Sequence, residues 1–290
     1  MRHRSITGVA VVLGMFLLGG LVFWGLKLAP QAPSPPAPPA AVWGAPQRTV
    51  RFVSYNILHN QRGVTQVIAE LKKLSADVLC LQEVESADVV PMAEALGMQQ
   101  HYHPRAYQRS ANLAGPKASW GNAILSKFPL YEADAIPNPG GGAFGVWAVI
   151  VVDGQKFLVA NVHLSATWNA NPVHIKQSGE FRYNEITNLI TAWQNRGSPP
   201  IVVTGDFNQI PLGNNYYEMT RHWTDALDAL GETGATFDGG LLQTRIDYFL
   251  LSKDWKPQAG GVIRTKASDH RPIWLEARAR DTSASTSRSQ

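Results

Sequence analysis

Cysteine is nearly absent from this sequence. The chain of 290 residues contains one cysteine, Cys80, so no disulfide bond can form within it. Cys80 lies in the apolar run DVLCLQ, where we expect a small buried side chain rather than a reactive thiol. A domain of this length can bury enough apolar surface to be stable without disulfide bonds, so their absence does not argue against export from the cytoplasm.

Charge is also scarce. Acidic and basic residues make up 17% of the chain, and the formal net charge is +4. Much of this surplus is terminal, because leaving out Arg2, Arg4, Lys27, Arg288 and Asp281 reduces 26 basic and 22 acidic residues to 22 and 21. Proteins that bind nucleic acids without sequence preference usually carry a stronger basic surplus. The composition therefore argues mildly against a nucleic acid substrate.

One long segment near the N-terminus has no charge. Ile6 to Leu26 are 21 residues without an acidic or basic side chain, and two arginines precede them. A helix needs about 20 apolar residues to cross a bilayer, and basic residues favour the cytoplasmic side. We therefore expect a cytoplasmic N-terminus at 1–5, a transmembrane signal-anchor at 6–28, and the remainder on the periplasmic or extracellular side. A cleaved signal peptide, which usually has a shorter apolar core, is the alternative.

Composition also divides the rest of the chain. Residues 29–46 are rich in Pro and Ala and predict an extended, semi-rigid spacer that cannot bury a core. Residues 47–280 have the composition of a folded domain. The last ten residues, 281–290, read DTSASTSRSQ and predict a disordered tail.

The spacing of apolar residues predicts an α+β domain. Apolar or alternating runs predict strands at 50–57, 76–84, 121–126, 145–152, 155–164, 201–207, 245–252 and 271–279. Helical periodicity predicts helices at 63–74, 86–96 and 174–195. Asp153-Gly154 is a strong hairpin signal, whereas residues 101–120 show no periodicity and predict a polar, basic and aromatic loop. Hairpins mixed with helical crossovers favour a layered fold with mixed sheets.

Acids, amides and histidines stand at the ends of several apolar runs: Asn56, Glu83, His163, Asp206, Asn208, Asp247, Asp269 and His270. Each one alone has an ordinary structural explanation, such as a turn, a cap or a buried histidine with its partners. Together they offer oxygen ligands without cysteine, which suits Mg²⁺ or Mn²⁺ rather than zinc. Two histidines can also donate hydrogen bonds to a phosphate or move a proton. The set indicates metal-assisted hydrolysis of a phosphate ester.

Seven short segments carry a resemblance to a known family: SYNI, LQEV, GNAILS, NVHLS, GDFN, RIDYFLL and SDHRPI. In this order they resemble the endonuclease/exonuclease/phosphatase superfamily, which includes DNase I-like nucleases, neutral sphingomyelinases and inositol polyphosphate 5-phosphatases. The match spans roughly residues 50 to 277. The resemblance implies a four-layer αββα sandwich over residues 47–280. It also implies a divalent metal ion, usually Mg²⁺, with Mn²⁺ also possible, bound at Glu83 with Asn56 and Asp269 beside it.

The resemblance also implies catalytic roles for five side chains. By the family pattern, His270 contacts the scissile phosphate and Asp247 orients it. Asp206 either activates the attacking water or donates a proton to the leaving group. Asn208 and His163 bind the phosphate and stabilise its developing charge.

The substrate is less well defined than the reaction. Apurinic-site endonucleases of the family carry a Tyr-containing segment where this chain has NVHLS, so the chain resembles the nuclease, sphingomyelinase and phosphatase branches more. We expect a membrane-tethered phosphodiesterase that acts on DNA or on a phospholipid or sphingolipid, with no obligate protein partner. A tether slightly favours lipid because it raises the local substrate concentration. A phosphomonoesterase acting on a soluble sugar or inositol phosphate and a non-catalytic binding module of the same fold are the alternatives.

Overall fold

The structure is a computed structural model that describes residues 41–61, 63–105, 120–138, 142–167, 169–240 and 243–280. The transmembrane segment expected at 6–28, most of the 29–46 spacer and the 281–290 tail lie outside these residues, as do residues 106–119 of the expected loop. Within the described ranges, no helix combines the length and the apolar character needed to cross a membrane.

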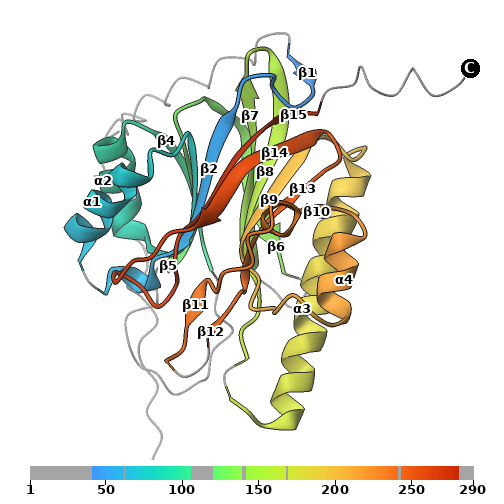
Figure 1. Ribbon diagram of the computed structural model, residues 1–290. Coiled ribbons are helices and arrows are strands. Elements are labelled where there is room, and N and C mark those ends of the chain that lie inside the picture. Colours follow the sequence, from blue (N-terminus) through green and yellow to red (C-terminus); the bar gives the residue numbers. More distant parts are fainter. Residues whose placement is uncertain are drawn as a thin grey trace, which may run out of the picture. The chain divides into compact units, whose positions relative to one another are not determined.

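Two mixed β-sheets form the centre of the fold (Figure 1). Sheet A contains β1 (Val42–Trp43), β6 (Leu130–Pro137), β7 (Ala143–Val152), β8 (Gln155–His163), β9 (Ile201–Asp206), β10 (Thr224–Asp225) and β13 (Asp247–Leu251). Sheet B contains β2 (Val50–Asn56), β3 (Val78–Glu85), β4 (Gln99–Pro104), β5 (Trp120–Ser126), β14 (Trp255–Val262) and β15 (Ile273–Ala279). The strand orders are β10-β13-β9-β8-β7-β6, with β1 beside β8, and β14-β15-β2-β3-β5-β4. A separate two-stranded sheet pairs β11 (Phe237–Asp238) with β12 (Gln243–Thr244).

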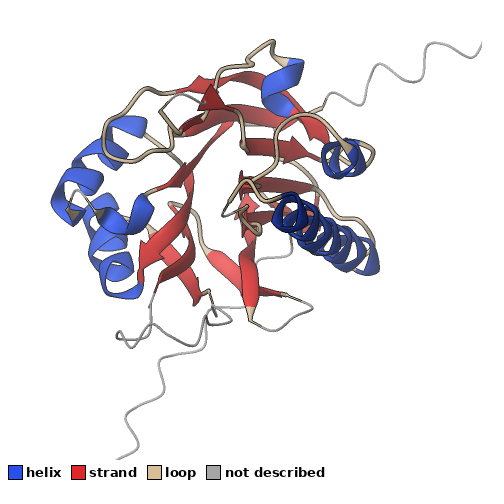
Figure 2. Ribbon diagram, turned by 90° about the horizontal axis from the view of Figure 1, so that it is seen from below, coloured by secondary structure: helices blue, strands red, loops and turns tan. Residues whose placement is uncertain are grey.

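Helices cover the outer faces of both sheets. They are α1 (Val64–Leu74), α2 (Ser86–Leu96), α3 (Pro172–Asn195) and α4 (Asn214–Thr220). The short 3₁₀ turn η1 (Leu58–Asn60) follows β2, and α5 (Ala226–Ala229) packs Ala226 and Leu227 into the core between the sheets. Helices α1 and α2 pack on sheet B, and α3 and α4 pack on sheet A, so the order through the molecule is helix, sheet, sheet, helix (Figures 1 and 2). The expected α+β class is therefore confirmed.

Three apolar cores join these layers. The core between the sheets contains Phe52, Phe157 and Trp255, whose rings meet edge to face at centroid distances of 6.2, 5.6 and 4.9 Å. The other two lie between each sheet and its helices. Successive side chains along a strand point alternately into the central core and toward a helix. The central strands are therefore apolar on both faces.

The inner faces of the strands change character along their length. Toward one end of the sandwich, apolar residues give way to a buried layer of neutral polar side chains, Ser54, Gln82 and Asn161. The Gln82 Nε2 donates to Asn161 Oδ1 at 2.6 Å and to Ser54 Oγ at 3.1 Å. Since Gln82 belongs to sheet B and Asn161 to sheet A, this layer joins the two sheets just before the strand ends.

Several strands were not expected from the sequence. Residues 99–104 form β4 rather than the start of a loop, and β6 and β14 also form without a clear apolar alternation. The end of the expected 29–46 spacer is ordered as well, because Val42–Trp43 pairs with Gln155 and Lys156 and Ala45 is buried. The predicted helices and the hairpin at Asp153-Gly154 are confirmed, with α3 beginning two residues earlier, at Pro172, behind the capping side chain of Asn171.

Candidate active site

Strand ends from both sheets bring the predicted side chains to one place. In sheet A, Asp206 at the end of β9 lies between His163 of β8, its partner in the parallel register, and Asp247 of β13, its partner in the antiparallel register. In sheet B, Asn56 ends β2 and Glu83 lies near the end of the neighbouring strand β3. All five side chains are buried or nearly so, with Glu83 the most exposed at 16%.

Glu83 reaches the site because its strand is irregular. Strict alternation would send Glu83 to the outer face with Leu79 and Leu81, but the pairing of β3 with β5 shifts between Leu81 and Val84. Glu83 itself has a φ of 54°, which is uncommon for a residue with a side chain. A bulge of this kind re-aims a side chain, and bulges are often found next to active sites.

The Glu83 carboxyl is held in its ionised form. Burial alone would raise its pKa, but hydrogen bonds from His59 and Asn56 outweigh burial and lower the pKa. The His59 Nε2 lies 2.9 Å from Glu83 Oε2, and the Asn56 Nδ2 donates to Oε1 at 3.1 Å. A carboxylate that keeps its charge while buried is suited to binding a cation.

Asn56 links the two sheets at this point. Its Nδ2 donates to Glu83 Oε1 and to Asp206 Oδ2, each at 3.1 Å, and its Oδ1 accepts from the Leu58 backbone N–H. The amide is therefore fixed with its two N–H groups between two carboxylates. An amide at the end of β2 can donate one hydrogen bond to each of the two carboxylates, which a carboxylate in its place could not do.

His270 is the charged histidine of the site. Its Nδ1 lies 3.0 Å from Asp247 Oδ2, and its Nε2 lies 3.5 Å from Asp206 Oδ2. Burial favours the neutral ring, but the two carboxylates outweigh it and raise the His270 pKa to about 10. Phe237 packs on the ring at a centroid distance of 5.0 Å. The result is an imidazolium whose orientation is set by Asp247.

Asp206 has the opposite tendency to Glu83. Its burial, together with the neighbouring Asp247 carboxylate, raises its pKa to about 7, although His270 and hydrogen bonds from Asn208 and Asn56 oppose the shift. The Asn208 backbone N–H donates to Asp206 Oδ1 at 2.8 Å. A carboxyl with a pKa near neutrality can both accept and release a proton under physiological conditions.

His163 differs from His270 in having no carboxylate on its Nδ1. Its Nε2 lies 3.5 Å from Asp206 Oδ2 and 3.8 Å from Glu83 Oε1, while Nδ1 is buried without a hydrogen-bond partner among the described residues. Burial, reinforced by Arg105, lowers the His163 pKa well below its ordinary value. The ring is therefore neutral, and the geometry favours the tautomer with its proton on Nε2, facing the site.

The GDFN segment has a specific reason for its glycine and its asparagine. Gly205 has a φ of 137°, and a Cβ there would lie 1.9 Å from the Val162 carbonyl oxygen, so no larger residue fits between β9 and β8. Asn208 has a φ of 48°, and its Nδ2 donates to the Leu164 carbonyl. These two positions fold the chain back over the end of β8, which brings the Asn208 amide to Leu164, the residue after His163.

Two groups of side chains at the strand ends have the composition of a metal site. Asp206, Asp247 and His270 offer ligand atoms within 4.8 Å of one another, but each ring nitrogen of the charged His270 already faces a carboxylate. This group is therefore better suited to proton transfer than to binding a cation. Ionised Glu83 has the oxygen donors that Mg²⁺ and Mn²⁺ prefer and fits such an ion. Asn56 would have to turn its Oδ1 from the Leu58 N–H toward Glu83 to join it as a ligand.

Asp269, the third predicted metal ligand, is linked to this pair through a serine. The Ser268 Oγ donates to the Asn56 carbonyl oxygen at 2.8 Å and lies 3.2 Å from Asp269 Oδ1. The structure thus brings Asp269 to the end of β2, where it is linked to Asn56 through Ser268. Asn56 and Glu83, in contrast, are joined by a direct hydrogen bond. The metal-binding role of all three remains a prediction.

Two further side chains lie close to Glu83, and His59 among them was not expected from the sequence. His59, in η1, contacts Glu83 and, through Nδ1, Glu85 at 3.4 Å. Trp120, at the start of β5, has its ring 4.8 Å from that of His59 and 5.9 Å from that of His163.

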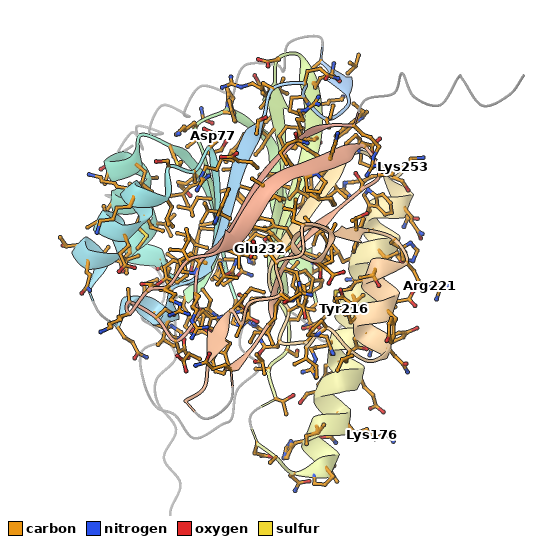
Figure 3. All side chains as sticks on the ribbon, in the orientation of Figure 1. Asp77, Lys176, Tyr216, Arg221, Glu232 and Lys253 are labelled. Carbon is orange, nitrogen blue, oxygen red and sulfur yellow. The ribbon has the colours of Figure 1, made fainter. Side chains whose placement is uncertain are left out.

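A separate groove lies on the outer side of sheet A. It has a volume of about 860 Å³ between α3 and α4, and Lys176, Tyr183, Tyr217 and Arg221 are among its lining residues. Lys176 and Arg221 are labelled in Figure 3, on the helices that flank the sheets. None of the strand-end residues lines this groove, so the chemistry described above lies elsewhere.

Together, the two-sheet α+β fold, the ionised Glu83 and the Asp247–His270–Asp206 group define a hydrolase of phosphate esters. Residues 53–270 match the model of the endonuclease/exonuclease/phosphatase family. This chain belongs to that family. No curated protein sequence matches the chain.

Solved structures share the fold at low sequence identity. The catalytic domain of human Nocturnin with a bound sulfate anion is 19% identical over 82% of this chain and 96% of its own, with a TM-score of 0.66. A mannosyl-6-phosphatase from Bacteroides thetaiotaomicron is 18% identical over 79% and 99%, with a TM-score of 0.60. A 3′ phosphatase from Neisseria bound to a product DNA hairpin is 17% identical over 78% and 98%, also at 0.60. These identities establish the fold alone.

Proposed function

We propose that this protein is a divalent-metal-dependent phosphodiesterase in which water attacks phosphorus. The observation that carries the proposal is the pair of buried carboxylates bonded to one amide, Asn56. Glu83 is held ionised, whereas the pKa of Asp206 is raised to about 7. Two carboxyl groups whose pKa values are shifted in opposite directions indicate separate roles, one in binding a cation and one in transferring a proton.

The residues divide the reaction between them. His270, held as an imidazolium by Asp247, donates its Nε2–H to a phosphate oxygen and stabilises the charge that develops there. Asp206 takes the proton of the attacking water, or returns one to the leaving oxygen. His163 and Asn208 supply further N–H donors to the phosphate. Losing one such donor typically lowers the rate on the order of 100- to 1000-fold.

Glu83, Asn56 and Asp269 would hold the metal ion. A Mg²⁺ or Mn²⁺ ion at these residues supplies Lewis-acid stabilisation of the phosphate oxygens. Because Asn56 also bonds Asp206, the same amide keeps the proton-transferring carboxyl in register with the metal residues.

We further propose that the enzyme is tethered to a membrane and acts outside the cytoplasm. The support comes from the sequence: a charge-free run of 21 residues follows two arginines, and a Pro/Ala-rich spacer follows the run. Mass spectrometry of the membrane-extracted protein tests this proposal. An intact N-terminus including Met1 supports an anchor, whereas loss of the apolar run supports a cleaved signal peptide.

A phosphomonoesterase is the second candidate. It is favoured by two of the structural neighbours, which are described as phosphatases, one of a mannosyl 6-phosphate and one of a DNA 3′ end. The two candidates share the metal and His270 and differ in the charge and size of the ester that they accept.

The first test is hydrolysis by the purified full-length chain with Mg²⁺. Supercoiled plasmid, sphingomyelin or phosphatidylcholine vesicles, and mannose 6-phosphate are offered in parallel, with EDTA and His270→Ala as controls. Plasmid nicking or headgroup release that needs both the metal and His270 supports the phosphodiesterase. Release of inorganic phosphate from mannose 6-phosphate alone would favour the second candidate. A folded His270→Ala variant with a near wild-type rate would contradict both.

A further inference from the structure

His59 occupies a strained backbone position beside Glu83. Leu58 and His59 are consecutive residues with φ values of 49° and 52°, in the left-handed region that residues with a side chain rarely adopt. Such a conformation is unfavourable for a residue with a side chain, so the surrounding structure must hold it there, and such strain clusters at functional sites. The consequence here is that the His59 ring faces Glu83.

The distance between the two side chains is that of two ligands on one ion. The His59 Nε2 and Glu83 Oε2 lie 2.9 Å apart. Two donors bound at about 2.1 Å and a right angle to an octahedral ion are about 3.0 Å apart. The pair therefore needs little rearrangement to exchange the proton that it shares in the metal-free protein for a divalent cation.

The other side of the His59 ring has the arrangement typical of a metal-bound histidine. Its Nδ1 lies 3.4 Å from Glu85 Oε1. A histidine that binds a metal through one nitrogen almost always donates the other N–H to a carboxylate or carbonyl, which fixes its tautomer and orientation. His163, the other histidine near Glu83, lacks this support, because its Nδ1 has no hydrogen-bond partner in the described part of the chain.

Packing further restricts the His59 ring without closing it off. The Trp120 ring meets it edge to face, with centroids 4.8 Å apart and an interplanar angle of 89°. The His59 side chain is 30% exposed and that of Glu83 is 16% exposed. A hydrated ion can therefore reach the two donor atoms from solvent.

We propose that His59 is a further ligand of the divalent ion at Glu83, binding through Nε2, and that Glu85 holds its ring in place. The inference rests on the proposed metal dependence and adds a residue that the SYNI and LQEV motifs do not include. It also has a consequence for metal choice. An imidazole suits first-row transition ions better than Mg²⁺, so the mixed nitrogen and oxygen donors favour Mn²⁺ over Mg²⁺.

Binding of Mn²⁺ to the purified full-length chain tests the proposal without any substrate. Electron paramagnetic resonance gives the Mn²⁺ affinity, and electron spin echo measurements on the bound ion detect a directly coordinated imidazole nitrogen. The wild type is compared with His59→Gln, Glu85→Gln and His163→Gln. His222→Gln is the matched control, since its Nε2 lies 3.6 Å from Glu218 Oε1 on α4, away from the site.

The nitrogen signal should disappear in His59→Gln and persist in His163→Gln and His222→Gln. Mn²⁺ affinity should fall about 10- to 100-fold in Glu85→Gln, the typical effect of losing the carboxylate behind a metal-bound histidine, and at least as much in His59→Gln. Mg²⁺ affinity should change much less. Circular dichroism confirms that each variant is folded.

Three results would overturn the proposal. A nitrogen signal that survives in His59→Gln but vanishes in His163→Gln would assign the ligand to His163. Unchanged or tighter Mn²⁺ binding in His59→Gln would mean that His59 competes with the ion, and a bound ion without any nitrogen signal would make the ligands oxygen alone. A wild type that binds neither Mn²⁺ nor Mg²⁺ would instead overturn the metal dependence itself.

Discussion

The two sheets bring different chemistry to the same end of the molecule. Sheet B supplies Glu83, which keeps its charge because His59 and Asn56 donate to it. Sheet A supplies Asp206, which is more deeply buried and lies beside Asp247, so its pKa is raised to about 7. Both carboxyl groups accept a hydrogen bond from the same Asn56 amide, whereas their burial and their other neighbours differ.

This comparison teaches that the function of a buried carboxyl group is set by the depth of its burial and by its other neighbours. The donors around Glu83 favour the charged form and suit it to a cation, whereas deeper burial and the carboxylate beside Asp206 favour the protonated form and suit it to proton transfer. The variants below separate the two halves of the site. If the sheets have distinct roles, each half can be disabled while the other still works.

The largest effect is expected from breaking the sheet A half. His270→Ala and Asp206→Ala should each lower turnover roughly 100- to 1000-fold or more, because the imidazolium or the proton acceptor is lost. Mn²⁺ binding by His270→Ala should stay close to that of the wild type, since the ring contacts Asp247 and Asp206 rather than Glu83. Steady-state hydrolysis and Mn²⁺ titration on the same samples measure both quantities. Loss of metal binding together with activity in His270→Ala would contradict the division between the sheets.

Breaking the sheet B half should have a different signature. A ligand at 100 times its dissociation constant stabilises a folded protein by roughly 2.7 kcal/mol. Mg²⁺ or Mn²⁺ should therefore raise the unfolding temperature of the wild type, and this increase should disappear in Glu83→Gln. Thermal unfolding with metal and with EDTA measures the difference. A Glu83→Gln protein that is stabilised as much as the wild type would show that the ion binds elsewhere.

The sequence predicted the central strands and helices well, and the edges poorly. Strands β2, β8 and β9 are buried on both faces and appear as apolar runs. The unexpected strands β4, β6 and β14 each stand at an end of their sheet. An edge strand pairs on one side and faces solvent, so it can be polar, as in QQHYHP, or carry Pro257 and Gly260, as in β14.

The sequence predicted which side chains lie together at the strand ends, but not their electrostatics. Strand ends and family motifs identified Asn56, Glu83 and Asp206, and the structure places them in direct contact. The opposite pKa shifts of the two carboxyl groups depend on neighbours from distant parts of the chain, which no local pattern reveals. His59 was missed because its strained backbone conformation has no signature in amino-acid composition.

The link between the halves can be tested without touching either one. Asn161 in sheet A accepts from Gln82 and donates to the carbonyls of Leu81 and Ala123 in sheet B, each at 2.8 Å. Asn161→Leu keeps the branching and the number of heavy atoms of the side chain, although its methyl groups are bulkier, and it leaves these buried groups without a partner, which costs about 1–3 kcal/mol. Urea unfolding should show this loss, while Asn195→Leu, at the exposed end of α3, should stay within about 0.5 kcal/mol of the wild type. Equal stabilities of the two variants would mean that the polar layer does not hold the sheets together.

The smallest effect concerns the support that α3 gives to the sheet A half. Glu185 of α3 accepts from the backbone N–H and the hydroxyl of Ser165, two residues after His163, at 2.8 and 2.9 Å. Burial raises the Glu185 pKa despite these bonds. A raised folded-state pKa means that the ionised form is disfavoured by folding, so this group contributes more stability below its ordinary pKa and less as pH rises through the folded value.

The Glu185→Gln variant lacks this titrating group, so the difference in stability between the wild type and the variant isolates its contribution. The stability of the wild type relative to Glu185→Gln should therefore increase as the pH is lowered from about 8 to about 4, measured by urea unfolding of both proteins in the same buffers. Glu180→Gln, whose side chain is 62% exposed on the same helix, is the control and should show a smaller change. A relative stability that decreases toward low pH would mean that the Ser165 hydrogen bonds outweigh burial. The segment after His163 would then be held by an ionised Glu185, as Glu83 is held on the other sheet.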